Sequence, residues 1–243
     1  MTVQGFSANA EQAWNELEWL ASARELIHWS NTTSAEEPLM LVVRHSHRET
    51  IASYDDMIGR GLTPLGHAMA KEFGRRLPPR KNVHIFHSYV PRCQETAEDI
   101  AEGIRDRSGQ VDLVEASDLL VGPRVVDPQL WRKLGKDGIW VLKFVNDWSR
   151  GAFTERQIEP IEEFKRRVVR EVIGKLRSAP ANSMHLHVTH DLFLVAARRL
   201  LQTASASHNR PAYLGGFGVV LKPDRLVVFD AGRSEEIPTP EQE

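Results

Sequence analysis

Cysteine is almost absent from the 243-residue sequence, which contains only Cys93. A single thiol can form neither an internal disulfide nor a cysteine-rich zinc site. No apolar run approaches the ~18 residues that a membrane-spanning helix needs. Acidic residues such as Glu11, Glu16 and Glu25 interrupt the first thirty residues, which is wrong for a secretory signal. We therefore expect a soluble, cytoplasmic protein that has no membrane partner.

An excess of charge of either sign is also missing. Lys and Arg number 31 and Asp and Glu number 33, which leaves a formal net charge of −2 at pH 7. A chain this close to neutral has no global electrostatic attraction to nucleic acid, so no nucleic-acid partner is expected. Hydrophobic residues at 41% and charged residues at 26% are close to the globular average. The length suits one compact domain, or one domain that carries an insertion.

Short apolar runs and amphipathic stretches alternate along most of the sequence. Strands are predicted at residues 39–43, 83–86, 185–189, 217–221 and 226–229, the last two as a hairpin. Helices are predicted at residues 11–28, 63–77, 92–105 and 191–201, where apolar residues recur every three or four positions. The first strand is apolar throughout, which is typical of a parallel strand buried on both faces. The pattern predicts an α/β fold, a three-layer sandwich with a mostly parallel central sheet and helices on both faces.

The same patterns divide the chain into segments. Residues 1–38 are predicted to form an N-terminal helical extension, of which about the first ten residues are a loose terminus. Residues 39–232 are predicted to form the α/β domain, and the looser pattern at about 111–159 is interpreted as an inserted cap over one end of the sheet. Residues 233–243 contain several Pro and Glu residues and are expected to be disordered. The apolar stripe of the extension is expected to pack on the domain, with a homodimer contact as the alternative.

The sharpest chemical feature follows the first predicted strand directly. There His45 is flanked by Arg44 and, three positions later, by Arg48. Guanidinium groups hold phosphate through charge-assisted and partly bidentate hydrogen bonds. A neutral imidazole between them could attack phosphorus and form a phosphohistidine. The pattern therefore indicates phosphate chemistry.

Two further clusters follow later strands. Arg92 lies where the second predicted strand turns into a helix, and His190 and Asp191 follow the strand at 185–189. Ligands of α/β sheets bind beyond the carboxyl ends of the strands. We therefore expect all three clusters to meet at one edge of the sheet, where they would supply a nucleophile, a group of cations and a proton donor.

In this order, the motifs resemble those of the histidine phosphatase superfamily, which includes phosphoglycerate mutases, histidine acid phosphatases and phosphohistidine phosphatases. Arg44-His45-Ser46 corresponds to the family's Arg-His-Gly. The other matching segments are Leu62-Thr63-Pro64-Leu65-Gly66, Ser88…Arg92…Thr96, Thr189-His190-Asp191 and Tyr213-Leu214-Gly215-Gly216. Together they span about residues 39–229, most of the chain.

The resemblance implies a role for each matching residue in handling a phosphoryl group. His45 would be the nucleophile, and four residues would bind the phosphoryl oxygens: Arg44, Arg48, Arg92 and His190. Loss of one such donor typically costs ~10²–10³ in rate. Because arginines neutralise the phosphate, neither a metal nor another cofactor is expected.

The resemblance leaves the proton donor open between two places. Asp191 stands where the acid-phosphatase branch has its donor and where the mutase-like branch has glycine. The mutase-like branch takes its acid from the inserted segment, in which Glu115, Asp118 and Asp127 are the candidates. Asp191 is our first choice, and it would protonate the leaving alkoxide before helping water to attack the phosphohistidine.

Each residue also has an interpretation without function. Asp191 is a favoured residue at the start of a helix, and His190 could be a core histidine with satisfied hydrogen bonds. Arg44 and Arg92 could be ordinary salt-bridge partners. Cys93 begins a helix but has no evident base partner. His185 and His187 share one face of a strand without a third metal ligand, which is a weak signal for a metal.

The most favoured function is a metal-independent phosphate monoester hydrolase that acts through a phosphohistidine on His45. The expected partner is a phosphorylated small-molecule substrate, with a phosphoprotein as the alternative. A phosphoglycerate-mutase-like phosphotransferase and a non-catalytic phosphate-binding regulatory module are the rival hypotheses. Ser46, in place of the family glycine, is the feature that favours the binding module, and its side chain is expected either to narrow the pocket or merely to add a hydroxyl.

Overall fold

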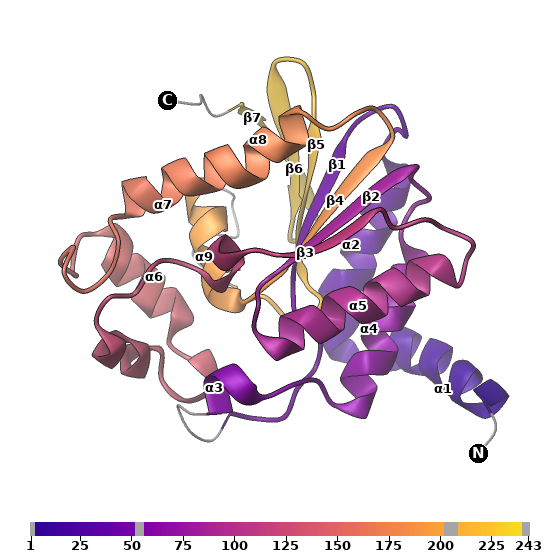
Figure 1. Cartoon of the computed structure of the whole chain (residues 1–243), viewed down its shortest axis with the longest axis horizontal. Coiled ribbons are helices and arrows are strands. Elements are labelled where there is room, and N and C mark those ends of the chain that lie inside the picture. Colours follow the sequence, from indigo (N-terminus) through magenta and orange to yellow (C-terminus); the bar gives the residue numbers. More distant parts are fainter. Residues whose placement is uncertain (1–2, 52–55, 202–208, 240–243) are drawn as a thin grey trace.

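A seven-stranded sheet in the order β3-β2-β4-β1-β5-β6-β7 forms the centre of the computed structural model, which describes residues 3–51, 56–201 and 209–239 (Figure 1). The strands are β1 (Leu39–Arg44), β2 (Asn82–His87), β3 (Leu113–Ala116), β4 (Ser183–Thr189), β5 (Gly216–Leu221), β6 (Arg225–Asp230) and β7 (Arg233–Pro238). The first four in the sheet order are parallel to one another, and β5, β6 and β7 add antiparallel pairs. The predicted fold class, with a mostly parallel sheet at its core, is confirmed.

Helices cover both faces of this sheet (Figure 1). One face carries α1 (Val3–Glu16), α2 (Ala21–Thr32), α4 (Pro64–Arg76) and α5 (Pro91–Arg105), and the other carries α6 (Val141–Ser149), α7 (Ile161–Val168), α8 (Gly174–Arg177) and α9 (Asp191–Leu200). A short helix, α3 (Asp56–Gly59), lies away from both layers, and a π-helical turn at Val169–Ile173 joins α7 to α8. The 3-10 turns are η1 (Glu18–Leu20), η2 (Asp118–Val121), η3 (Pro128–Leu134) and η4 (Lys136–Gly138). Within the described residues, none of these helices is long and apolar enough to cross a lipid bilayer.

The uninterrupted apolar run of β1 is explained by burial on both sides of the sheet. All six residues of β1 are buried. Met40 and Val42 contribute to the hydrophobic core under α7 and α9, whereas Leu41 and Val43 contribute to the core under α4 and α5. Successive side chains of a strand point to opposite faces, so a strand between two helical layers needs apolar residues at every position.

The predicted helix at residues 11–28 is two helices, and the expectation of a loose terminus over the first ten residues is wrong. The first helix, α1, already begins at Val3 and ends at Glu16, and a 3-10 turn leads into α2. Arg24 of α2 donates from Nη1 to the carbonyl oxygens of Trp14 (2.7 Å) and Leu17 (3.0 Å). The bond to Trp14 satisfies a carbonyl in the last turn of α1, and the bond to Leu17 ties α2 to the turn between the helices, which stabilises the break.

The predicted boundaries are also wrong at the start of the cap and in the tail. Residues 113–116 form β3, an edge strand paired with β2, so the segment that leaves the sheet begins after Ala116. Residues 233–238 form β7, which pairs with β6 through a two-residue turn of Ala231 and Gly232, both at positive φ. A strand at the edge of a sheet forms by backbone pairing and needs no apolar pattern. The composition of residues 113–116 and 233–238 therefore did not indicate a strand. The rest of the expected disordered tail, residues 240–243, lies outside the described residues.

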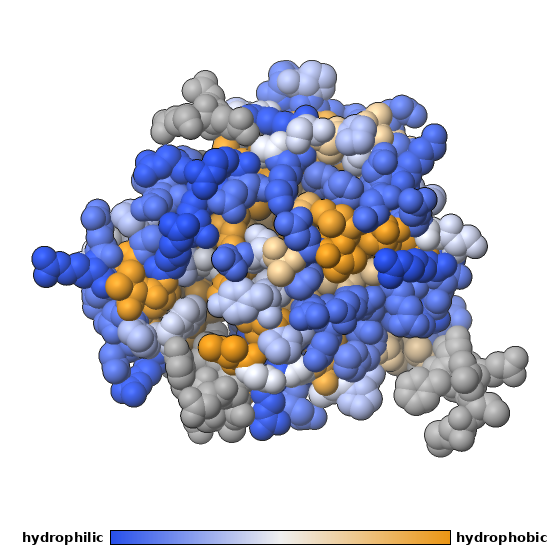
Figure 2. Space-filling model, in the orientation of Figure 1, coloured by the Kyte–Doolittle hydropathy of each residue, from blue (hydrophilic) through white to orange (hydrophobic). Residues whose placement is uncertain are grey.

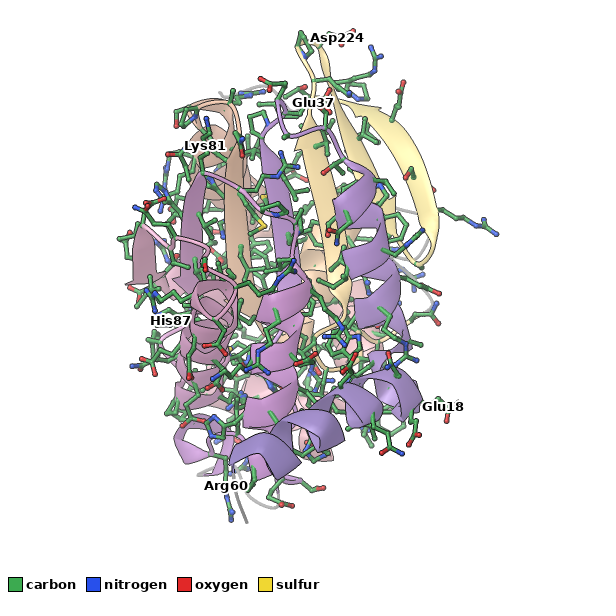
Figure 3. All side chains as sticks on the ribbon, turned by 90° about the vertical axis from the view of Figure 1, so that its right-hand side faces the viewer. Glu18, Glu37, Arg60, Lys81, His87 and Asp224 are labelled. Carbon is green, nitrogen blue, oxygen red and sulfur yellow. The ribbon has the colours of Figure 1, made fainter. Side chains whose placement is uncertain are left out.

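Strand register brings distant residues to one edge of the sheet. In β1 and β4, Arg44 is paired with Thr189, so His45 and His190 follow side by side. Figure 3 shows Lys81 at the upper end of β2 and His87 near its lower end, and Arg60 lies further down, beyond the carboxyl ends of the parallel strands. The carboxyl edge is therefore the place where the chemistry-bearing segments collect.

Two histidines of β4 face the core under α7 and α8 rather than this edge. His187 is 2% exposed, its ring stacks on Phe86 at 5.0 Å between centroids, and neither ring nitrogen has a hydrogen-bond partner among the described residues. Burial, with smaller repulsion from His185 and Lys175, lowers the pKa of His187 to about 3. Burial likewise lowers the pKa of His185 to about 4. Both imidazoles are therefore neutral in the folded protein.

Acid should destabilise this protein through His187. In the unfolded chain His187 binds a proton below pH ~6.5, whereas in the folded chain it binds one only below about pH 3. The free energy of unfolding should therefore fall, as pH falls through this window, by at most about 1.4 kcal/mol per pH unit for this residue. In His187→Leu the slope between pH 6 and pH 4 should be shallower by that amount, measured by urea denaturation at several pH values. An unchanged slope in His187→Leu would contradict this account, and His28→Leu, at an exposed position of α2, is the matched control.

Candidate active site

The structure brings all six sequence-predicted site residues to one pocket at the carboxyl edge of the sheet. The pocket has a volume of about 440 Å³ and is lined by Arg44, His45, Arg48, Arg92, His190 and Asp191, among others. Backbone hydrogen bonds fix this edge: His45 N–H donates to Thr189 O (2.9 Å) and Ser88 N–H to Val188 O (3.0 Å). The ends of β1, β2 and β4 are thus held together before any side chain is considered.

His45 is held as a neutral imidazole whose Nε2 carries no proton and accepts a hydrogen bond. Its Nδ1 lies 2.8 Å from the carbonyl oxygen of Ser46, which can only accept, so Nδ1 carries the proton. On the other side, Arg92 Nε donates to Nε2 at 3.1 Å. Burial, and then the positive charges of Arg92 and Arg44, lower the pKa of His45 well below its usual value. A buried, unprotonated Nε2 is the form of histidine that can act as a nucleophile.

His190 lies beside His45 and is neutral for similar reasons. The two ring centroids are 5.5 Å apart. Arg92 Nη2 contacts Nδ1 of His190 at 3.1 Å, so Nδ1 accepts and Nε2 is left to donate to Ser88 Oγ at 2.9 Å. Burial, followed by the charge of Arg92, lowers the pKa of His190 well below its usual value. Burial lowers the pKa of Arg92 itself to about 10, so it stays a cation that bridges both imidazoles.

Arg44 and Arg48 reach the pocket from the end of β1 and the loop after it. Arg44 donates from Nη1 to Pro211 O (3.0 Å), and its guanidinium lies 4.4 Å from the ring centre of Tyr213. Arg48 donates from Nη1 to the carbonyl oxygen of Glu49 (2.7 Å). Both side chains are buried, and the Nε of each has no hydrogen-bond partner among the described residues. Because both residues line the pocket, an anion bound there can contact their guanidinium groups.

Asp191 is held as a carboxylate by two arginines. Arg210 donates to its Oδ2 from Nε (2.7 Å) and Nη2 (2.5 Å), and Arg44 Nη2 is 3.5 Å from the same oxygen. Burial alone would raise the pKa of Asp191, but the charges of Arg44 and Arg210 outweigh it and the pKa is lowered. Its Oδ1 accepts from Leu192 N–H at 2.9 Å, so Asp191 also supports the first turn of α9, as its alternative interpretation allows.

Two charged residues that bind the predicted site residues were themselves not predicted from the sequence, and Arg132 of η3 also lines the pocket without having been predicted. Arg210 holds Asp191 from the loop before β5, and Asp137 comes from the cap (from here on, residues 117–159). Asp137 Oδ1 accepts from Arg48 Nη2 at 2.6 Å, and its backbone oxygen accepts from Arg210. Neither residue belongs to a motif or a periodic pattern, so the sequence offered no signal for them. Asp137 also has a φ of 59°, an uncommon conformation that its contacts with both arginines hold in place.

The other acidic candidates of the insertion do not reach the pocket. Glu115 lies exposed on the edge strand β3, and Asp118 is exposed in η2. Asp127 uses its Oδ1 to accept from Gln129 N–H (2.9 Å) at the start of η3. Among the described lining residues, Asp137 and Asp191 are the carboxylates.

Ser46 is turned away from the pocket. It is completely buried, its Oγ donates to Gly66 O at 2.7 Å, and its N–H donates to Thr96 Oγ1 at 3.0 Å. A side chain at Gly66 would place Cβ 2.1 Å from His47 O, so a glycine is required where α4 meets this loop. The serine therefore adds a hydroxyl bond between the loop and α4 and does not narrow the pocket.

The remaining nucleophile and metal hypotheses find little support. Burial raises the pKa of the Cys93 thiol to about 12, so this thiol stays protonated and unreactive. In the parts of the chain that the structure describes, no three His, Cys, Asp or Glu residues are grouped so as to hold a metal ion.

The pocket carries a strong positive field on a nearly neutral chain. Five arginines line it (Arg44, Arg48, Arg92, Arg132 and Arg210) against two aspartates, and the two histidines are neutral. A small dianion is the ligand that such an excess of guanidinium groups favours, since three of them, Arg44, Arg48 and Arg92, are buried. A neutral imidazole within such a cluster is an arrangement that suits phosphoryl transfer.

Comparison with known families identifies this arrangement. The family model "histidine phosphatase superfamily (branch 1)" matches residues 40–215, which is more than half of the chain. The chain therefore belongs to the histidine phosphatase superfamily. No curated protein matches it in sequence.

Solved structures agree on the fold. A phosphoglycerate mutase from Bacillus anthracis str. Sterne is 18% identical with a TM-score of 0.53, and the match covers 84% of this chain and 94% of that one. YhfR from Bacillus stearothermophilus is 17% identical with a TM-score of 0.51, covering 83% and 96%. A mycobacterial glucosyl-3-phosphoglycerate phosphatase in complex with inorganic phosphate is 17% identical with a TM-score of 0.48, covering 85% and 98%. At these identities the first two likenesses show the phosphoglycerate-mutase-like fold.

Replacement of Ser46 should change stability and leave phosphate binding intact. Ser46→Ala removes one buried hydrogen bond and should cost about 1 kcal/mol of unfolding free energy. Ser46→Gly should cost about 0.5–1 kcal/mol more because glycine loses more entropy on folding. In both variants the Kd for inorganic phosphate, measured by titration calorimetry, should stay within about threefold of wild type, since Oγ does not line the pocket.

Ser178→Ala is the matched control, because Ser178 Oγ makes a similar bond to Gly174 O (3.3 Å) at an exposed position. It should change the unfolding free energy by less than about 0.5 kcal/mol. A tenfold gain in phosphate affinity in Ser46→Gly would instead mean that the serine obstructs the pocket.

Proposed function

We propose that this protein is a metal-independent phosphate monoester hydrolase that acts through a phosphohistidine on Nε2 of His45. The observation that carries the proposal is the state of His45, a buried neutral imidazole whose Nε2 lone pair faces Arg92 and the pocket. Membership of a superfamily whose named structural relatives include mutases and phosphatases supports it. The arginines supply the positive charge for the phosphoryl oxygens, so a metal ion has no role in the proposed reaction.

In the first step, Nε2 attacks phosphorus and the bond from phosphorus to the leaving oxygen breaks. The bond electrons stay on that oxygen, which takes up a proton. Arg44, Arg48 and Arg92 would hold the three phosphoryl oxygens, with His190 donating once Arg92 has turned to the phosphate. Nδ1 of His45 keeps its proton, and its hydrogen bond to the Ser46 carbonyl oxygen stabilises the positive charge that develops on the ring.

Asp191 is the proposed proton donor, although it is ionised in the free protein. A phosphate dianion bound by Arg44 would add negative charge next to Asp191. It would also weaken the attraction between the Arg44 guanidinium and the Asp191 carboxylate. Both effects raise the pKa of the carboxyl, so substrate binding favours its protonated form. In the second step, water attacks the phosphohistidine, Nε2 leaves phosphorus, and Asp191 takes the proton of the water.

The rival hypotheses differ in where the phosphoryl group goes. A phosphotransferase would pass it to an acceptor hydroxyl, and a binding module would not become phosphorylated at all. The feature that favoured the binding module, Ser46, lies against α4 instead of in the pocket.

Phosphorylation at His45 is the first test. Protein mixed with 4-nitrophenyl phosphate and quenched in alkaline denaturant, which preserves an acid-labile P–N bond, should carry one phosphoryl group on His45 by mass spectrometry. Inorganic phosphate should be released in the presence of EDTA. His45→Ala should lose more than about 10³-fold in kcat, since it removes the nucleophile. His28→Ala at an exposed site is the control, and phosphate release by His45→Ala at the wild-type rate would overturn the proposal.

The proton donor can be identified by comparing how much its replacement slows the hydrolysis of substrates with different leaving groups. In Asp191→Asn, kcat/KM for an alkyl phosphate should fall by about 10²–10³, whereas kcat/KM for 4-nitrophenyl phosphate should fall by less than about tenfold. The difference arises because nitrophenolate leaves without a proton and an alkoxide does not. Asp137→Asn, the other carboxylate of the pocket, should change both substrates by the same factor. The reverse pattern would assign proton donation to Asp137.

A further inference from the structure

The pocket has two unlike halves. The floor consists of the six predicted site residues described above, which lie at or after the ends of β1, β2 and β4, and Asp137 and Arg210 bind to it. The wall consists of apolar and aromatic side chains from four separate segments: Ile51, Val90, Val121, Trp131, Leu134 and Leu192. Of these, Ile51, Val90, Leu134 and Leu192 are buried, so they form a packed surface rather than mobile side chains at the mouth.

The apolar character continues to the rim. Ile58 of α3 and Tyr89 line the same pocket and are 58% and 52% exposed. Figure 2 shows apolar surface in orange directly above the place that α3 occupies in Figure 1. Exposed large apolar side chains at the mouth of a pocket mark a surface that a ligand covers.

Neutral hydrogen-bonding side chains are missing from the wall. Among the described lining residues there is no Ser, Thr, Asn or Gln. Beside the guanidinium of Arg132, the neutral polar side-chain groups outside the floor are the Tyr89 hydroxyl and the Trp131 indole N–H. A leaving group with several hydroxyls would give up hydrogen bonds to water there and find few partners. Each unpaired polar group in such a place carries a desolvation cost.

The pocket is large enough for more than a phosphate. Its volume of about 440 Å³ lies within the ~300–1,000 Å³ typical of pockets that enclose whole small molecules. The charged floor can hold one phosphoryl group, and the rest of the volume faces the apolar wall.

We infer that the preferred substrate is a phosphate monoester of a hydroxyl-poor apolar alcohol or phenol, small enough to fit one pocket. The inference rests on the proposed function and adds the class of leaving group to it. The phosphoryl group binds the arginines, and the hydrocarbon part packs against Val121, Leu134 and Leu192. Sugar phosphates and polyol phosphates fit the floor but leave their hydroxyls unpaired against the wall.

The decisive comparison uses two substrates of the same shape. Cyclohexylmethyl phosphate and glucose 6-phosphate both carry the phosphate on a CH₂ attached to a six-membered ring, and they differ in the ring oxygen and hydroxyls. We expect kcat/KM to be at least about 10²-fold higher for the cyclohexyl compound, the discrimination typical of a pocket that meets an unmatched hydroxyl. Equal values, or a preference for glucose 6-phosphate, would overturn the inference and leave the hydrolase proposal intact.

Binding of the corresponding phosphonates separates this inference from the proposed function, because phosphonates bind without being hydrolysed. Cyclohexylmethylphosphonate should bind wild-type protein at least about 30-fold more tightly than its polyhydroxylated counterpart, as measured by titration calorimetry. If this preference is found but no ester is hydrolysed, the hydrolase proposal fails and the apolar specificity stands. If both phosphonates bind equally, the apolar specificity fails whatever the enzyme activity.

A variant of the wall gives a third readout. Val121→Thr keeps the side-chain shape and adds a hydroxyl, so it should reduce the ratio of the two kcat/KM values about three- to tenfold. Val126→Thr is the matched control, because Val126 lies in the same cap, is 63% exposed and does not line the pocket. It should leave the ratio unchanged, and an equal loss in both variants would contradict a role for the wall in specificity.

Discussion

Buried positive charge at one edge of the sheet is the constraint on which the site depends. Arg44, Arg48 and Arg92 are each less than a tenth exposed, and buried cations cost several kcal/mol unless they are paired. The protein pairs them through backbone carbonyls, two imidazoles and the carboxylates Asp137 and Asp191. Together with burial, the charges of Arg92 and Arg44 keep His45 unprotonated, which is the form that the proposed attack by Nε2 requires.

The carboxylates that pair the arginines also connect the cap to the sheet. Asp137 binds Arg48 through its side chain and Arg210 through its backbone oxygen, and Arg210 binds Asp191 at the start of α9. The next residue, Gly138, is at a φ of 72°, and a Cβ there would lie 3.0 Å from Arg210 Nη2. A glycine therefore lets the cap approach the ion pair closely. The guanidinium of Arg48 therefore both lines the pocket and holds the cap through Asp137.

The motifs predicted the fold class and the floor of the site because short-range chemistry determines them. An apolar run followed by Arg44-His45, and a second strand followed by His190-Asp191, are local signals, and the parallel order of strands in an α/β sheet brings their ends together. Local sequence was a poorer guide at the edges. β3 and β7 form by backbone pairing with a neighbour already in place, and the break between α1 and α2 depends on a hydrogen bond from Arg24.

The sequence by itself thus determined the α/β architecture, the six residues of the floor and their cationic character, since each follows from residue type and position after a strand. Only the tertiary structure decided the rest. It turned Ser46 away from the pocket, brought Asp137 and Arg210 to it, and kept Glu115, Asp118 and Asp127 out of it. It also assembled the apolar wall from segments far apart in the chain. These outcomes depend on how the cap packs over the sheet, and packing between distant segments leaves no pattern in the local sequence.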